Sequence, residues 1–434
     1  MKRLLTLAII LSFIIINAGV SYAQPPSPDA GAYILIDAGN GDVLCEKNSD
    51  VTLFPASTTK IMTAILALES GIDLETEMTA TQTAIDRIGV NGSNIGIIPG
   101  EKISLEYLLK ATLISSANEA SNIIAENICE SYEEFIALMN KRARELGATG
   151  THYVNASGIH DPEHYTTAAD LAKIARHAMT LPKFREIVST HSFTMPVTNK
   201  HSKWPVLSNS NKLMLYDKND LYVINGIKTG FTGPAGYNLI SSATDVNGME
   251  LISVVLKVQN ENAAENVRIY SKELLDYGFN NFKEVTLIEE GKVYRNVKVE
   301  EAADIYGLDL ITTKSLVRVL PKDESQWNIQ ESSQVNENIY APVNKGDIMG
   351  YVEFKKDGRS IGRIDLLAAR AIEYKPAPVT LATLTSDPKK ASENVYIRAG
   401  SIVAGLIIIF IIIRSILKAI SKRSNHRNHS RKYF

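Results

Sequence analysis

The sequence predicts an α+β fold: an antiparallel sheet with a helical insert, then a small all-β domain and a C-terminal membrane helix. Three observations predict it. Strand patterns occur near the start of the chain and return around Lys228, the segment from Thr59 to about Met179 is mostly helical, and an uncharged apolar run begins at Ala399. One antiparallel sheet can therefore be built from both ends of the first domain.

The N-terminus has the three parts of a secretory signal. Two basic residues precede an apolar run from Leu4 to Ile16, and Ser21-Tyr22-Ala23 is a small-x-small cleavage site. A retained membrane anchor is the alternative, but the run is short and ends in a clean cleavage site. We therefore expect residues 1–23 to be removed and residues 24–32 to form a linker.

The first domain is expected over residues 33–278. Tyr33–Asp37 and Asp42–Cys45 flank Asn40-Gly41, a turn pair typical of hairpins. Further strand patterns lie around Lys228, at Tyr237–Ser242 and at Leu251–Lys257, and an amphipathic helix follows from about Asn262 to Tyr277.

In the helical insert, the stretch Ser57-Thr58-Thr59-Lys60 places a hydroxyl and an amine one helical turn apart. A partly desolvated lysine is neutral some of the time, so Lys60 could accept the Ser57 proton and prepare an acyl-transfer nucleophile. The apolar stretch Ile61–Leu68 follows and favours a buried helix. Two other Ser-x-x-Lys matches, at Ser386 and Ser415, lie in a linker and in the apolar tail.

Two further motifs follow in order, Ser116-Ala117-Asn118 and Lys228-Thr229-Gly230. With Ser-x-x-Lys they resemble the three motifs of the penicillin-binding-protein and serine beta-lactamase superfamily. The flanking residues, including the block Asn155–Asp170, look like those of the low-molecular-mass D-alanyl-D-alanine carboxypeptidases, and the likeness runs from about Tyr33 to about Tyr374. The resemblance implies a beta-lactamase/transpeptidase-like catalytic domain.

The resemblance also implies how the catalytic residues divide the work of cleaving an acyl-D-alanine bond. Ser57 would attack and carry the acyl ester, and Lys60 would accept its proton. Ser116 would lie beside Lys60 and Lys228 and relay a proton to the departing amine. Two lysines placed close together would also lower each other's pKa, which a lysine base requires.

The remaining motif residues would bind substrate. Asn118 would hydrogen-bond the substrate amide, and Lys228 with Thr229 would hold its terminal carboxylate. Gly230 has no side chain to block a substrate laid against the strand edge. The backbone N–H groups of Ser57 and Phe231 would form the oxyanion hole.

The resemblance implies a peptidoglycan stem peptide as substrate and beta-lactam antibiotics as covalent inhibitors. No cofactor is implied. The net charge of -2 gives no reason to expect nucleic acid. Cys45 and Cys129 could pair in an oxidising compartment, but both are more simply interpreted as buried small residues.

The stretch His160-Asp161-Pro162-Glu163-His164 matches the H-x-x-E-H pattern of inverted zinc proteases. That pattern needs a continuous helix to bring both imidazoles to one face, and Pro162 disfavours a helix there. We therefore expect an ordered loop that leads into a helix from Thr167, and no metal site.

Residues 281–375 are expected to form the small all-β domain. Short strand patterns lie at Val293–Val299, Leu316–Leu320 and Gly350–Phe354, with turn signals at Asn344–Asp347 and Lys356–Gly358. The segment offers no nucleophile, metal-binding pattern or phosphate loop. A spacer or protein-contact role is therefore expected.

After a linker over residues 376–398, an apolar helix is expected over residues 399–417. It would be about 28 Å long, at about 1.5 Å per residue, which is enough to span a membrane. The basic tail over residues 418–434 would lie on the cytoplasmic side, leaving the catalytic domain outside the cell. A helix lying in the interface is the alternative, but the run has no polar face until its end.

The motifs thus indicate a membrane-anchored serine carboxypeptidase that removes terminal D-alanine from peptidoglycan stems through a Ser57 acyl-enzyme. One alternative is another enzyme of the superfamily, a beta-lactamase or a DD-endopeptidase. Ser116-Ala117-Asn118, in place of Ser-Asp-Asn, counts against a class A beta-lactamase. The other alternative is a penicillin sensor that is acylated without turnover.

Overall fold

The computed structural model describes residues 24–216, 220–303, 307–375 and 395–429, and in the last segment side chains are described over 399–420. The predicted signal peptide and most of the predicted linker before the apolar helix lie outside these residues. The chain divides into two compact units, one built mainly from residues before Glu290 and the other mainly from residues after it. The finer domain boundaries stay predictions.

The first unit contains the predicted antiparallel sheet, with five strands in the order β2-β1-β9-β8-β7. Asn40-Gly41 lies in the turn between β1 and β2, and Gly41 has the positive φ, +85°, that such a turn requires. The sheet is built from both ends of the domain, as the sequence predicts. The strands are β1 (Ala32–Asp37), β2 (Val43–Lys47), β7 (Tyr222–Thr232), β8 (Gly236–Asp245) and β9 (Glu250–Val258).

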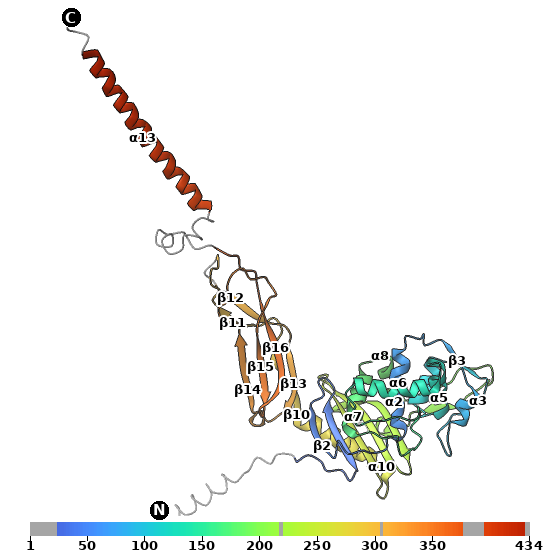
Figure 1. Ribbon diagram of the computed structural model, residues 1–434. Helices are drawn as coiled ribbons and strands as arrows, with labels where there is room; N and C mark the ends of the chain where they lie inside the picture. The colour runs from blue at the N-terminus through green and yellow to red at the C-terminus, as the bar shows by residue number, and fades with distance from the viewer. Residues whose placement is uncertain (1–23, 217–219, 304–306, 376–394, 430–434) are drawn as a thin grey trace, which may run out of the picture. The chain divides into compact units, whose positions relative to one another are not determined.

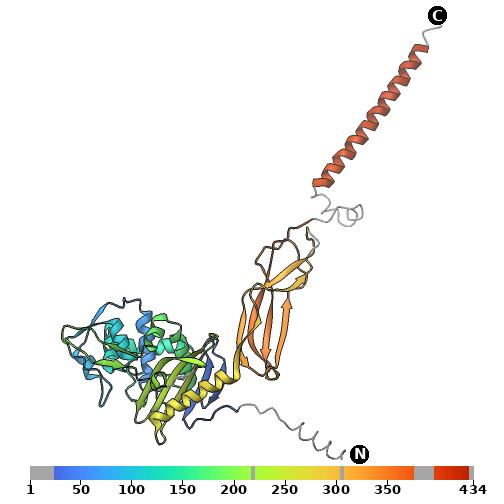
Figure 2. The same ribbon diagram turned by 180° about the vertical axis from the view of Figure 1, so that it is seen from behind.

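The two faces of this sheet pack against different helices. Successive residues of a strand point to opposite faces, so neighbouring residues of β1 join different cores. Ile34 and Ile36 of β1 join the core that contains the helical insert. Tyr33 and Leu35 join a second core with the helix α10 (Ala263–Asn281), which lies across the other face (Figure 2). The predicted helix is present and extends to Asn281, beyond the predicted end at Tyr277.

In the helical insert, the other helices pack around α2 (Figure 1). This helix begins at Lys60, and every residue from Lys60 to Ala67 is buried. Its helices are α2 (Lys60–Glu69), α3 (Gln82–Asp86), α4 (Leu105–Leu113), α5 (Asn118–Ile128), α6 (Tyr132–Glu145), α7 (Ala168–Met179) and α8 (Pro182–Val188). Shorter elements are η1 (Ala56–Thr59), β3 (Glu77–Thr79), β4 (Lys102–Ser104), β5 (Ser192–Thr194), β6 (Val206–Ser208) and α9 (Lys212–Tyr216).

The described elements between α10 and the C-terminal helix are strands, apart from the 3-10 helix η2 (Glu324–Gln326). The pair β10 (Phe282–Ile288) and β13 (Leu316–Pro321) is antiparallel. A second sheet has the order β11-β12-β16-β15-β14. Its strands are β11 (Val293–Val297), β12 (Leu308–Thr312), β14 (Ile329–Val335), β15 (Ile348–Lys356) and β16 (Arg359–Ala368). The predicted all-β region is therefore present.

The C-terminal helix α13 covers Val395–His429. Its segment Ala399–Ile420 spans 22 residues and is long and apolar enough to cross a membrane. The apolar side chains of this segment, such as Leu406 and Phe410, are exposed to solvent in the chain by itself. Anchoring in a lipid membrane would remove this apolar surface from water.

Candidate active site

Ser57 lies on a tight turn that leads directly into the buried helix α2. The 3-10 helix η1 holds Ser57, and α2 begins three residues later at Lys60. Ala56 has a φ of +49°, a conformation that residues with a Cβ adopt only under constraint. Gly158 lies against this turn so closely that a Cβ there would come within 1.8 Å of the Ala56 carbonyl oxygen. The turn Ala56–Thr59 that carries Ser57, the predicted nucleophile, is called the nucleophile turn below, and it is held by a loop that requires glycine.

The Lys60 amine has three neutral hydrogen-bond partners. Nζ lies 2.9 Å from Ser57 Oγ, 2.7 Å from Asn118 Oδ1 and 2.7 Å from the Ser157 carbonyl oxygen. The Asn118 and Ser157 oxygens can only accept hydrogen bonds, so they use both N–H groups of a neutral amine. The remaining lone pair is then available for the Ser57 hydroxyl proton.

Both lysines of the motifs are buried. Burial lowers the pKa of Lys60 well below its usual value, and the charge of Lys228 lowers it further. Burial alone lowers the pKa of Lys228 to about 7. Both pKa shifts have the direction that the sequence predicts, although the Lys228 shift comes from burial rather than from the neighbouring lysine.

The Ser-x-Asn motif lies at the start of α5. Ser116 has a φ of +60° and lines the same cavity as Ser57, and Asn118 is the first residue of the helix. Besides accepting from Lys60, the Asn118 side chain donates from Nδ2 to the Ile88 carbonyl oxygen at 2.9 Å. The Asn118 amide therefore positions Lys60. Its predicted contact with the substrate amide and the predicted relay through Ser116 stay predictions.

Lys228-Thr229-Gly230 lies on β7, the edge strand of the sheet. The Lys228 amine donates to the Thr229 carbonyl oxygen at 3.1 Å, and Thr229 Oγ1 lies 2.8 Å from Ser210 Oγ. The Phe231 ring packs against Tyr237, with 4.3 Å between ring centroids. Ser210 was not predicted from the sequence, since a lone serine in a loop carries no signal of its partner.

The sequence predicts that Gly230 leaves room for the substrate. The structure shows that a side chain there would also clash with the backbone of the protein itself. A Cβ at this position would lie 2.9 Å from the Pro55 carbonyl oxygen and 3.2 Å from the Ser57 backbone nitrogen. The strand therefore packs directly against the backbone of the nucleophile turn. This contact also brings β7 close to the Ser57 N–H, one of the two predicted oxyanion-hole donors.

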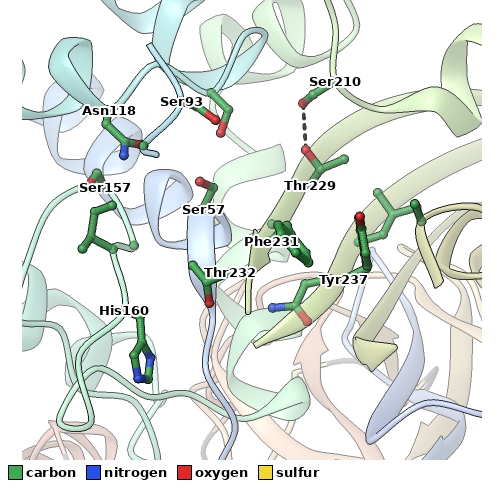
Figure 3. A pocket seen from close by; sticks show the side chains of 18 of the residues that line it. Ser57, Ser93, Asn118, Ser157, His160, Ser210, Thr229, Phe231, Thr232 and Tyr237 are labelled. Atoms are coloured by element: carbon green, nitrogen blue, oxygen red, sulfur yellow. Dashed lines mark hydrogen bonds between the residues drawn. The ribbon is translucent and has the colours of Figure 1, made fainter. Parts of the chain in front are cut away.

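A cavity of about 750 Å³ joins these elements. Figure 3 shows the Ser57 hydroxyl between Asn118 on one side and Thr229 and Phe231 of β7 on the other. The nucleophile turn, the start of α5 and the edge strand thus form the walls of one site. Of the predicted site residues, Lys60 and Lys228 lie buried behind the cavity surface.

Two groups that contact Lys60 or the nucleophile turn were missed by sequence reasoning. The first is the Ser157 carbonyl, a main-chain group without a side-chain signature. Its turn is shaped by Asn155, whose Oδ1 accepts from the Ser157, Gly158 and Ile159 N–H groups. An asparagine shortly before a glycine is the sequence signal of such a turn.

The zinc-protease-like stretch is a turn rather than a helix. Its second histidine, His164, is buried, and its Nδ1 accepts from the Val154 N–H at 3.2 Å. The other ring nitrogen then carries the proton and donates to Thr59 Oγ1 at 2.8 Å. His160 instead packs edge-on against Phe54. His164 is thus the second missed contact with the nucleophile turn.

Both cysteines are free thiols in the structure. Cys45 is buried, as predicted, whereas Cys129 is only partly buried, at the end of α5. In the part of the chain that the structure describes, no three His, Cys, Asp or Glu side chains gather in a way that could hold a metal ion.

Comparison with known proteins gives matches over both units. A family model described as D-alanyl-D-alanine carboxypeptidase matches residues 20–260, and one described as the C-terminal domain of penicillin-binding protein 5 matches residues 282–374. The carboxypeptidase DacF of Bacillus subtilis is 30% identical over 376 residues, which cover 85% of this chain and 94% of the relative. DacA of Haemophilus influenzae is 31% identical over 382 residues, which cover 84% of this chain and 93% of the relative.

The solved structures agree with the predicted fold. Penicillin binding protein 5 from Haemophilus influenzae matches with a TM-score of 0.68 and 30% identity, covering 81% of this chain and 100% of that chain. The carboxypeptidase DacD from Francisella tularensis matches with a TM-score of 0.60 and 25% identity, covering 83% of this chain and 99% of that chain. The beta-lactamase/transpeptidase-like prediction is confirmed at the level of the fold.

Proposed function

The chain belongs to the D-alanyl-D-alanine carboxypeptidase family, and we propose that it removes the terminal D-alanine from peptidoglycan pentapeptide stems through an acyl ester on Ser57. The observation that carries this proposal is the Ser57–Lys60 pair. The two groups are 2.9 Å apart, and neutral acceptors use the other Lys60 N–H groups. A buried amine of lowered pKa that is placed in this way is suited to act as a general base.

Acylation would begin when the Lys60 lone pair takes the Ser57 proton and Oγ attacks the carbonyl carbon of the penultimate D-alanine. The carbonyl oxygen would become an oxyanion, held by the N–H groups of Ser57 and Phe231. As the carbonyl re-forms, the C–N bond breaks and the departing amine needs a proton. Ser116 would relay it from Lys60, and free D-alanine would leave.

Deacylation would use Lys60 as the base a second time. A water molecule would lose its proton to Lys60 and attack the ester, and Ser57 would leave with a proton. The terminal carboxylate of the stem would be held by Thr229 and the nearby Lys228 amine during acylation. Asn118 would contact the substrate amide.

Beta-lactams would acylate Ser57 by the same steps, because their strained amide places a carboxylate where the terminal D-alanine carboxylate binds. The apolar segment of α13 supports membrane anchoring. We propose a single pass with the catalytic domain outside the cell, a topology that brings Ser57 to the peptidoglycan.

The experiment is mass spectrometry of the full chain after incubation with benzylpenicillin. We expect one covalent adduct, located on the peptide that contains Ser57, and none in Ser57→Ala. Ser386→Ala and Ser415→Ala are matched controls, since both serines begin a Ser-x-x-Lys match and come later in the chain than the described residues that line the cavity, which end at Arg268. Both variants should be labelled like the parent. Labelling that survives Ser57→Ala would refute the proposal.

A further inference from the structure

Glu119 is a buried carboxylate that the proposed reaction does not use. It is fully buried in the first turn of α5, directly after the motif residue Asn118. Its Oε1 accepts from the Ile95 N–H at 2.7 Å and from the Gly96 N–H at 3.2 Å. In the described part of the chain its Oε2 is buried without a hydrogen-bond partner. A carboxylate in such a position needs an explanation.

The N–H groups that Glu119 binds belong to residues 88–96, a loop that lines part of the cavity. We call it the rim loop. The same loop is bound by Asn118, whose backbone N–H donates to the Ser93 carbonyl oxygen at 2.8 Å and whose Nδ2 donates to the Ile88 carbonyl oxygen. The residues of the rim loop that line the cavity are Val90, Asn91, Gly92 and Ser93. Asn118 and Glu119, the first two residues of α5, therefore fix the position of the rim loop, and Asn118 also contacts Lys60.

Glu119 also brings a negative charge close to the buried Lys60 amine. Around Lys60, the charged or titratable groups from the packed elements are Lys228 of β7, Glu119 of α5 and His164 of the loop before α7. The charge of Glu119 raises the pKa of Lys60, against burial and Lys228, which lower it. Burial raises the pKa of Glu119 itself, and backbone N–H groups of the rim loop favour its ionised form.

We propose that Glu119 is a positioning residue with two separable effects: one oxygen holds the rim loop in place, and the negative charge stabilises Lys60 when it has received the Ser57 proton. The inference rests on the proposed role of Lys60 as base. It accounts for a carboxylate that is buried beside Asn118 with one oxygen that has no hydrogen-bond partner among the described residues.

The charge effect has a definite consequence for the rate of acylation. Without the negative charge, Lys60 is more often neutral, so the acid limb of the pH profile should move to lower pH. The same loss makes Lys60 a weaker base, so the plateau rate should fall. A change that only loosened the fold would lower the plateau without moving the limb.

The test is stopped-flow acylation of the full chain in detergent micelles by a chromogenic cephalosporin, over a pH range from acid to alkaline. For Glu119→Gln, whose carbonyl still accepts from the rim loop, we expect the limb to move down by roughly half to one pH unit. The plateau should fall roughly threefold. KM for D-alanine release from a peptide should stay within about twofold, because the loop is still held.

Glu119→Asp keeps the charge and shortens the side chain, so it should leave the limb in place and raise KM at least about threefold. Glu101→Gln is the matched control. Glu101 is also fully buried and accepts from a backbone N–H, that of Ile98, but it is not among the groups that shift the Lys60 pKa. Its variant should leave the limb unchanged.

The inference is overturned if the acid limb of the pH profile lies at the same pH in Glu119→Gln and in the parent. It is also overturned if both Glu119 variants move the acid limb, or if both change KM. Should Glu119→Gln not fold, Glu119→Asp still decides, since a displaced limb in that variant would contradict the assignment. A parent enzyme without any acid limb would instead refute Lys60 as the base. The two failures are therefore distinguishable.

Discussion

Lys60 is the residue on which the proposed chemistry depends, since its amine is fully buried and each of its hydrogen-bond partners is uncharged. An amine with a carboxylate partner would stay protonated and could not act as a base. Here burial and Lys228 both favour the neutral form, and together they outweigh the charge of Glu119, which is not a hydrogen-bond partner of the amine. The pair of accepting oxygens then directs the lone pair to Ser57, so orientation and proton affinity come from the same contacts.

Gly230→Ala tests how closely the edge strand must approach the nucleophile. The added Cβ would lie 2.9 Å from the Pro55 carbonyl oxygen, so the strand or the Ser57 turn must shift. Displacement of a reacting group by about 1 Å can cost roughly a hundredfold in rate. We expect penicillin acylation to fall by at least roughly tenfold in a folded protein.

The control for this variant is Gly233→Ala, because a Cβ at Gly233 has no atom within 4 Å. Acylation kinetics by stopped flow and thermal unfolding by circular dichroism are compared for both variants. Equal acylation rates for Gly230→Ala and the parent would contradict the tight packing described for the nucleophile turn.

At the scale of elements, the nucleophile turn and the Lys60 side chain that follows it are held between three segments. The loop before α7 supplies the Ser157 carbonyl and His164, α5 supplies Asn118, and β7 packs against the turn through Gly230. Each contact joins residues far apart in the chain. The geometry at Ser57 therefore depends on the complete fold of the domain.

The His164 contact predicts an acid-sensitive fold. Burial lowers the pKa of His164 to about 3, so the folded state keeps it neutral while the unfolded chain takes up a proton below its usual pKa of about 6.5. The stabilisation is complete above pH ~6.5 and is lost as the pH falls toward about 3. A shift of this size corresponds to at most about 4–5 kcal/mol in the free energy of unfolding.

Urea unfolding of the chain in detergent, followed by near-ultraviolet circular dichroism between about pH 4.5 and pH 8, measures this dependence. His164→Gln should show a smaller loss of unfolding free energy on acidification than the parent. His191→Gln, at an exposed position, serves as the control and should follow the parent. The same pH dependence in His164→Gln and the parent would show that another group is responsible.

At the scale of the whole molecule, the cavity and the apolar segment that could span a membrane lie in separate parts of the chain. Every residue that lines the cavity lies between Ser57 and Arg268, whereas the apolar segment of α13 begins at Ala399. A fragment ending near Glu393 should therefore be soluble and as active as the full chain on a soluble peptide. Sedimentation and D-alanine release measure both properties, and activity lost with solubility retained would show that the tail shapes the site.

The motifs and the sheet could be predicted from the sequence because both leave local patterns. Ser57 and Lys60 are three residues apart, and β1 and β9 are short apolar runs next to turn residues. The Ser157 carbonyl, Glu119 and the Ser210 partner of Thr229 could not be predicted. Their roles depend on which loops meet, and tertiary packing decides that without a local signal. Gly230 was predicted for a substrate, but its closest neighbours are backbone atoms of the protein.

The central claim is that the Ser57 acyl-enzyme forms and is hydrolysed repeatedly, and D-alanine release measures this directly. The enzyme is mixed with a large excess of a diacetylated tripeptide that ends in D-Ala-D-Ala, and free D-alanine is followed over time. We predict continuous release, with no release from the L-Ala-terminated analogue, whose methyl and carboxylate cannot fit together against Lys228 and Thr229. A single burst equal to the enzyme concentration, followed by no further release, would contradict the claim and indicate a sensor that is acylated without turnover.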